Sequence, residues 1–122
     1  MTVKISLRAI VYGETKSLAL FDSNHMGDIN GLVTNANPND TIIWKLDCCS
    51  GIKRITSIHS SSKTGHTVFI SEPKKRFLCK GFKLQLELPK TDEERKEKYT
   101  IECILWDDTP LIIDPYIRIP PP

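Results

Sequence analysis

The chain has 122 residues, a length that suits one domain and buries roughly two-thirds of its unfolded surface without disulfides or metal. Its net charge is only +2, which argues against a nucleic-acid binder, because such proteins gather a stronger basic excess on one face. Abundant Val, Ile, Leu and Phe argue against disorder. We therefore expect a single folded domain over residues 1–122.

The first residues have the pattern of a strand and not that of a targeting segment. Polar residues alternate with apolar ones through Arg8, whereas a secretory signal needs an unbroken apolar stretch. No stretch reaches the roughly 20 apolar residues of a membrane helix. We expect a soluble cytoplasmic protein, or a secreted one if a leader has been removed.

Three strands are predicted in the first half of the chain from alternating apolar and polar residues. They are Val3–Tyr12, Ser17–Phe21 and Thr41–Leu46. The last follows a turn over Asn35–Asp40, where proline, Asn and Asp favour tight backbone geometry. Trp44 lies on the apolar face of its strand, so we expect it in the core.

The segment Ile52–His59 has isoleucines three residues apart, which is a helical spacing. Its β-branched content favours extended backbone instead, so we predict a strand with a bulge or bend. A polar loop is expected at Ser60–Gly65, followed by a short strand at His66–Ile70.

Phe82–Leu88 and Tyr99–Leu105 have the clearest alternation in the chain and are predicted to be strands. Pro89–Lys98 lies between them and has no apolar face, so we expect a solvated hairpin loop. Within it, Thr91 and Glu94 have the spacing of a capping box, which allows one helical turn.

The C-terminal part predicts a turn at Asp107–Pro110 and short strands at Leu111–Ile113 and Tyr116–Ile119. Pro120–Pro122 cannot donate backbone hydrogen bonds, so we expect these prolines to end the sheet and keep the last strand at an edge. An edge strand offers a surface for pairing with a partner or a second copy. About eight short strands without an amphipathic helix are typical of a sandwich or barrel.

Two motifs resemble those of the cupredoxin family. Pro38-Asn-Asp-Thr-Ile-Ile-Trp44 is similar to the family's Pro-Gly-Asp-Thr-Val-x-Trp turn and strand, with Asn39 in place of the glycine. Tyr99-Thr-Ile-Glu-Cys103 resembles the Tyr-x-x-x-Cys strand that carries the copper thiolate. The motifs cover about a tenth of the chain, and immunoglobulin-like sandwiches share parts of them. The resemblance implies an all-β, Greek-key, two-sheet sandwich, cupredoxin-like or immunoglobulin-like, of about eight strands.

The copper chemistry of that family does not transfer to this chain. A blue-copper site needs a cysteine, two histidines and usually a weak axial methionine. In the family a histidine and the methionine follow the cysteine closely, but no histidine or methionine follows Cys103 here, and the methionines are Met1 and Met26. The resemblance therefore implies a sandwich without the metal loop, with Cys103 as a small buried residue. We expect no cofactor.

Histidines and cysteines elsewhere allow a second hypothesis. His59 and His66 flank a predicted loop, and with a cysteine such as Cys49 they could bind zinc or copper. No recognised ligand spacing is present, so loop-end histidines exposed to water are the simpler interpretation. His25 has less to recommend it as a ligand.

The chain has four cysteines, for which we expect free thiols: Cys48, Cys49, Cys79 and Cys103. Alternation places one of the adjacent pair inward and the other outward. An outward thiol near Lys53 and Arg54 could have a lowered pKa and react with oxidants, whereas an inert surface cysteine is the plainer alternative.

A basic run comprises Lys74-Lys-Arg76, Lys80 and Lys83, with Phe77 and Phe82 inside it. Such a pattern can bind single-stranded nucleic acid through phosphate contacts and stacking. However, Phe82 belongs to a core alternation, and the acidic residues Asp92, Glu93, Glu94 and Glu97 offset the local field. We therefore expect a solvated loop and no nucleic-acid partner.

No catalytic motif is present in the sequence. Asp107, Asp108 and Asp114 lack the dense spacing of a calcium loop. Neither a Gly-x-Ser-x-Gly turn nor a phosphate loop or dinucleotide fingerprint occurs. A hydrolase whose residues meet only in three dimensions is a weaker possibility.

The sequence thus predicts a non-enzymatic binding or protein-interaction module. Its expected working surfaces are the loops Asp47–Lys53 and His59–His66, together with the Tyr116–Ile119 edge. The alternative is a metal-binding or thiol redox protein that uses His59, His66 and a cysteine.

Overall fold

The computed structural model describes residues 1–23, 28–29, 33–47, 49–61, 68–76, 81–89 and 91–121, and every regular element among them is a β-strand. In chain order the strands are β1 (Thr2–Tyr12), β2 (Thr15–Asp22), β3 (Asp28–Ile29), β4 (Val33–Asn35), β5 (Thr41–Leu46), β6 (Ile52–Ser60), β7 (Lys74–Lys75), β8 (Phe82–Gln85), β9 (Arg95–Leu105), β10 (Pro110–Ile113) and β11 (Tyr116–Ile119). No helix in these residues is long and apolar enough to cross a membrane.

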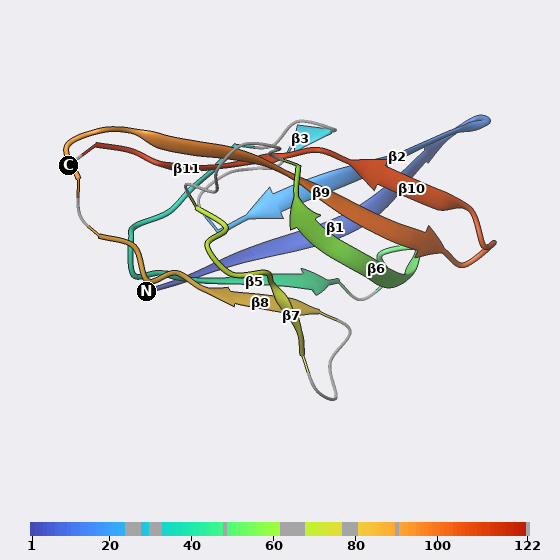
Figure 1. The fold of residues 1–122 in the computed structure, drawn as a ribbon. Coiled ribbons are helices and arrows are strands. Elements are labelled where there is room, and N and C mark those ends of the chain that lie inside the picture. Colours follow the sequence, from blue (N-terminus) through green and yellow to red (C-terminus); the bar gives the residue numbers. More distant parts are fainter. Residues whose placement is uncertain are drawn as a thin grey trace.

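The strands form two sheets that pack as a sandwich (Figure 1). The first sheet has the order β3-β2-β1-β5-β8-β7. The second has the order β10-β9-β11-β4, and β6 pairs with β9. Strand β1 is antiparallel to β2 and parallel to β5, and β11 is parallel to β4, so both sheets are mixed. The predicted all-β two-sheet sandwich is confirmed, with more strands among the described residues than the eight expected.

Inward-facing residues of the two sheets form one hydrophobic cluster. Strand β1 contributes alternate residues such as Ile5 and Leu7, neither of which is exposed. Trp44 on β5 is fully buried, as its alternation predicts, and Tyr99 on β9 approaches it from the other sheet. The period of two in the sequence therefore does place the core correctly.

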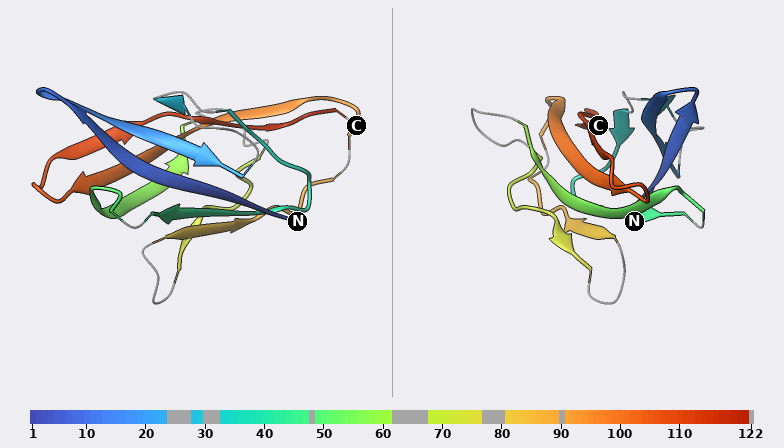
Figure 2. Two further views of the ribbon diagram at one scale, coloured as in Figure 1. Left: turned by 180° about the vertical axis from the view of Figure 1, so that it is seen from behind. Right: turned by 90° about the vertical axis from the view of Figure 1, so that its right-hand side faces the viewer.

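Two tight turns lie at the end of the sandwich away from the chain termini (Figures 1 and 2). Gly13 has φ +63° in the two-residue turn between β1 and β2, where glycine adopts this conformation without strain. Asp108 has φ +66° in the turn between β9 and β10, and its N–H donates to the Leu105 carbonyl at 2.9 Å. A type I turn closed by a residue in this conformation is a common three-residue hairpin loop.

Strand β6 explains the isoleucines spaced three apart. Ile52, Ile55 and Ile58 are all buried. The pairing of β6 with β9 shifts register twice, between Ile52 and Arg54 and between Ile55 and Ser57. Each bulge adds one residue to the inward repeat, which turns a spacing of two into a spacing of three. The predicted bulged strand is therefore confirmed.

The prediction that Tyr116–Ile119 is an edge strand is wrong. Strand β11 pairs with β9 on one side and with β4 on the other. The prolines after Ile119 end the strand lengthwise but leave both of its sides available for hydrogen bonds. The sequence pattern missed β4, a three-residue strand that pairs from a distant part of the chain.

Two other local predictions also need correction. Residues 68–70 of the expected strand His66–Ile70 are not in a strand, and residues 66–67 lie outside the described part. The expected hairpin loop Pro89–Lys98 instead leads from β8 in the first sheet to β9 in the second, and β9 already begins at Arg95. Strand β9 starts early because Ile117 and Ile119 of β11 pair opposite its first residues.

Gly81 provides a test of the packing between β5 and β8. A Cβ atom at this position would lie 2.3 Å from the backbone oxygen of Trp44. Because backbone cannot move aside cheaply, Gly81→Ala should lower the free energy of unfolding by about 1–3 kcal/mol in urea titrations. Gly13→Asn is the control, since no atom lies within 4 Å of its Cβ position and Asn tolerates positive φ. Equal losses in the two variants would contradict the steric explanation.

Candidate functional site

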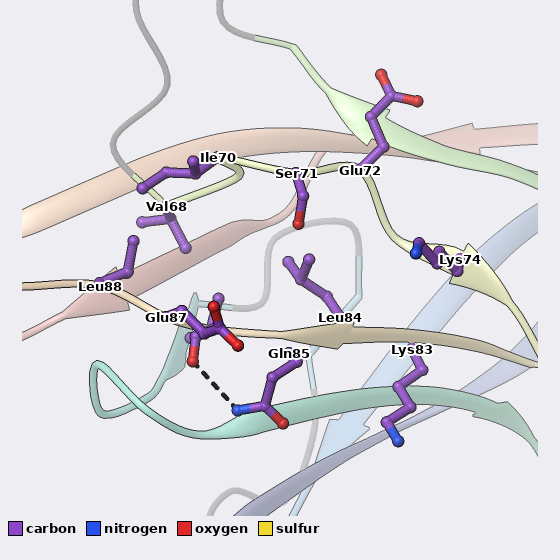
Figure 3. A pocket seen from close by; sticks show the side chains of 11 residues that line it. Val68, Ile70, Ser71, Glu72, Lys74, Lys83, Leu84, Gln85, Glu87 and Leu88 are labelled. Carbon is purple, nitrogen blue, oxygen red and sulfur yellow. Dashed lines mark hydrogen bonds between the residues drawn. The ribbon is translucent and has the colours of Figure 1, made fainter.

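A groove of about 480 Å³ lies between segments 68–74 and 83–88 (Figure 3). Its floor is apolar, because Val68, Leu84, Leu86 and Leu88 are buried beneath it. Ile70 lies on its rim and is 64% exposed. An apolar floor with polar surroundings is typical of a binding site.

One wall of the groove is an open strand edge. Leu86 N–H donates to the Asp40 carbonyl at 2.9 Å, and Leu88 N–H donates to the Pro38 carbonyl at 3.1 Å. Backbone groups alternate in direction along a strand, so the N–H and C=O of Gln85 and Glu87 point the other way, into the groove. On that side β7 pairs only with Phe82 and Lys83. Within the described residues the ladder therefore stops just before Gln85.

The opposite wall is held by a buried carboxylate. Glu97 on β9 is 3% exposed, and its Oε1 accepts hydrogen bonds from the N–H groups of Val68 at 2.9 Å and Phe69 at 3.2 Å. Its Oε2 accepts the hydroxyl of Ser60 at 2.5 Å. Two successive N–H groups that share one oxygen cannot alternate as they do in a strand. The chain therefore stays away from β8 here and reaches it only at β7, which leaves the groove between them.

Polar side chains line the open edge. The hydroxyl of Thr41 donates to Gln85 Oε1, and the Gln85 amide donates to the carbonyl of Asn39 at 3.1 Å. Figure 3 shows Lys83 on the opposite side of the strand from Leu84, which points into the groove. The described side chains that line the groove include neither histidine nor cysteine. This arrangement can hold an extended chain.

The predicted loop Asp47–Lys53 contributes to a second pocket, of about 500 Å³, near the tight turns. Cys49 lines this pocket, is exposed and has φ +61°. The basic residues that line the pocket with it are Arg8 and Lys16 and not the predicted Lys53 and Arg54.

Both cations of this second pocket have carboxylate partners. Arg8 lies 3.9 Å from Asp47, and Lys16 binds Asp107. The hydrogen bond from Lys16 holds the pKa of Asp107 well below its usual range, with further help from Thr109. Because the positive charge is already compensated, this pocket has little attraction for an anionic ligand.

Two of the proposed metal ligands, His59 and Cys49, lie far apart. His59 lies opposite Thr100 on the outer side of the second sheet, whereas Cys49 precedes the other end of β6, roughly 20 Å away at the rise of a strand. His66, His25, Cys48 and Cys79 lie outside the described residues. Among the described residues, no group of three or more His, Cys, Asp or Glu side chains is arranged to hold a metal ion.

His59 has acidic and hydroxyl neighbours in an order that does not suit catalysis. Its Nε2 lies 3.7 Å from Glu102 Oε2, and the Ser57 hydroxyl donates to that same oxygen at 2.5 Å. A serine triad needs the histidine between the serine and the acid, whereas here the acid lies in the middle.

Cys103 and the three aspartates have structural surroundings. Cys103 is 1% exposed, and burial raises the pKa of its thiol to about 11. Asp107 binds Lys16, Asp108 lies 3.3 Å from Lys53, and Asp114 accepts a hydrogen bond from Thr100. Each aspartate therefore has a partner of its own, and the three do not converge on one point.

Comparison with known proteins does not name a relative. No protein-family model matches the chain, and no curated protein matches it in sequence.

The role of Glu97 in holding the groove wall can be tested. Glu97→Leu leaves the N–H groups of Val68 and Phe69 without their acceptor, which should cost about 2–5 kcal/mol of unfolding free energy. Glu97→Gln keeps an acceptor oxygen and should cost less. Urea titration measures the stability, and amide exchange at Val68 and Phe69 reports the wall itself. Equal losses, or unchanged exchange in Glu97→Leu, would contradict this role.

The buried thiol of Cys103 should make the stability of the protein depend on pH. The thiol pKa is 9.0 in its ordinary environment and about 11 in the folded protein, so folding favours the protonated form. Its contribution to stability is complete below pH 9.0 and is lost as the pH rises towards about 11. Cys103→Val should lose less stability than the wild type over this range, measured by urea titration at several pH values. Cys49→Ser is the control and should behave as the wild type does; identical pH profiles for the wild type and Cys103→Val would overturn the assignment.

Proposed function

We propose that this protein is a non-enzymatic interaction module that binds an extended polypeptide segment along the open edge at Gln85 and Glu87. This edge is the observation that carries the proposal. It offers two N–H donors and two C=O acceptors that face a groove with an apolar floor. A strand added at a sheet edge gains its affinity from such groups and its specificity from pockets for alternate side chains.

The shape of the groove supports an extended occupant. A bound strand would lie in line with β7, which pairs antiparallel with β8. The first residue of β7, Lys74, lies beside the groove. Alternate side chains of that strand would reach the buried floor at Leu84 and Leu86, and others would contact Ile70 on the rim. A helix is too wide to make the same backbone hydrogen bonds.

The proposal includes a cupredoxin-like sandwich without copper. In support, the two motifs that carry the resemblance lie in different sheets and meet in the core, where Trp44 Nε1 donates to Tyr99 Oη at 3.1 Å. The β9–β10 turn that follows Cys103 is tight, and neither a histidine nor a methionine occurs from there to the end of the chain. An interaction role does not require the metal.

Proline substitution distinguishes the contribution of the backbone edge to peptide binding from that of the side chains. Glu87→Pro removes an N–H that faces the groove and is not needed by the sheet, and proline is tolerated at such edges. Peptides selected from a random library on the immobilised protein should bind Glu87→Pro about tenfold more weakly, since one hydrogen bond and the room for a strand are lost. Glu87→Ala is the matched control and should bind as the wild type does.

Backbone NMR shifts locate the same peptides on the protein. The amides of Gln85 and Glu87 should shift on binding, together with those of Val68 and Ile70. Peptides that shift only the pocket around Cys49, or that bind Glu87→Pro and wild type equally well, would show that the edge is not the binding site.

A further inference from the structure

The outer face of the first sheet gathers basic residues from four strands. The register places Lys4 of β1 beside Ile43 of β5, Ile43 opposite Lys83 of β8, and Lys83 opposite Lys74 of β7. These residues form one row across the sheet, and its three lysines are exposed. Lys45 lies two residues after Ile43 on the same strand and therefore on the same face. We call Lys4, Lys45, Lys74 and Lys83 the basic face.

Carboxylates do not neutralise the basic face. Among the described residues, none of its four lysines has an ion pair with Asp or Glu. Glu72 and Glu87 line the groove together with Lys74 and Lys83, but they form no ion pair with either lysine.

The acidic run that was expected to offset this charge lies elsewhere. Glu94 pairs with Arg118 of the second sheet at 2.7 Å, and Glu97 is buried in the core. Glu94 and Glu97 therefore do not cancel the positive potential of the basic face, and the low net charge of the chain conceals a local excess.

The pairing of Lys74 with Lys83 carries an electrostatic cost. The two residues are direct cross-strand partners, and like charges in that relation destabilise a sheet. Unlike Lys16 or Lys53, neither lysine has a described carboxylate partner that relieves the repulsion. An anion bound across β7 and β8 would remove the cost.

We infer that the basic face binds the phosphate backbone of double-helical nucleic acid. Three strand spacings separate β1 from β7 in the row, or about 14 Å. A duplex presents about eight phosphates over that length, enough for every lysine of the face to find one. This role goes beyond the proposed peptide groove: Lys74 and Lys83 also line the groove, whereas Lys4 and Lys45 do not.

Features of the face favour a duplex over other anions. Single strands are bound by exposed aromatic rings that stack on bases. Phe82 is 7% exposed. Phe21 lies opposite Ser6 on the outer face of β2, but it is half-buried and has Arg8 over its ring at 5.9 Å. The exposed large apolar residues of the described chain lie outside β5, β7 and β8. Those of β1, Val11 and Tyr12, are at the far end of the strand, roughly 25 Å from Lys4 at the rise of a strand, so none lies among the four lysines to insert into a lipid surface.

The test compares two double variants of equal charge. Lys4→Gln/Lys45→Gln removes two lysines of the basic face that do not line the groove, and Lys53→Gln/Lys98→Gln removes two from the second sheet. Each lowers the net charge from +2 to 0, since two positive charges are lost. Fluorescence anisotropy with a labelled short DNA duplex at increasing KCl gives the affinity and its salt dependence.

We expect the basic-face variant to lose affinity and to reduce the slope of log K against log salt by about 2, while the control stays near the wild type. Equal weakening by the two variants, or no binding by the wild type at low salt, overturns the inference. So does tighter binding of a single strand, or preferential binding of polyglutamate or of vesicles containing an anionic lipid. Because neither variant touches the groove, peptide binding should be unchanged in both, which keeps the two proposals separately testable.

A charge reversal at Lys83 distinguishes an effect on duplex affinity from an effect on the stability of the fold. Lys83→Glu places an opposite charge across from Lys74, so the melting temperature should stay the same or rise while affinity for the duplex falls. A lower melting temperature, or unchanged duplex affinity, contradicts the inference.

Discussion

The contact between Trp44 and Tyr99 joins the two sheets. Trp44 Nε1 donates to Tyr99 Oη at 3.1 Å, and neither side chain is exposed. A buried indole N–H must find an acceptor, and here the phenol oxygen supplies it, so the Trp44 ring can fill the core without an orphaned donor. The same burial raises the pKa of Tyr99 well above its usual value. Phe69 stacks on Tyr99 with ring centroids 5.2 Å apart, which brings the connection between β6 and β7 into the same unit.

This aromatic unit links the core to the groove. Phe69 is held on one side by the rings and on the other by Glu97, which accepts its N–H. A carboxylate with 3% exposure would be costly by itself, but the N–H groups of Val68 and Phe69 and the Ser60 hydroxyl compensate its charge. The wall of the groove is thus built into the sandwich, and a bound strand would meet a preorganised surface.

Alternation along single strands could be read from the sequence, whereas the pairing between strands could not. It placed Trp44 in the core and predicted the bulged β6, because both depend on residues close together in the chain. It failed for β11, whose neighbour β4 lies some eighty residues earlier. Glu97 was assigned to a solvated loop because its neighbours are charged. Extending the alternation of Tyr99 back by two residues would have placed it inward, and that is the signal that was missed. The groove had no local signal, since its walls come from two separate segments.

The distribution of lysines also depends on the pairing between strands, which the sequence of a single strand does not reveal. Three strands of the first sheet, β1, β5 and β8, each place a lysine on the polar side of their alternation: Lys4 beside Ile5, Lys45 beside Trp44, Lys83 beside Phe82. Read singly, each is an ordinary solvated residue of a half-buried strand. Only the order β1-β5-β8-β7 makes them neighbours, while Glu97 is directed to the core and Glu94 pairs with Arg118 of the second sheet. Net charge is a sum over the chain, but the potential that a partner meets is set by strand order, so a nearly neutral sequence can still fold into a surface of one sign.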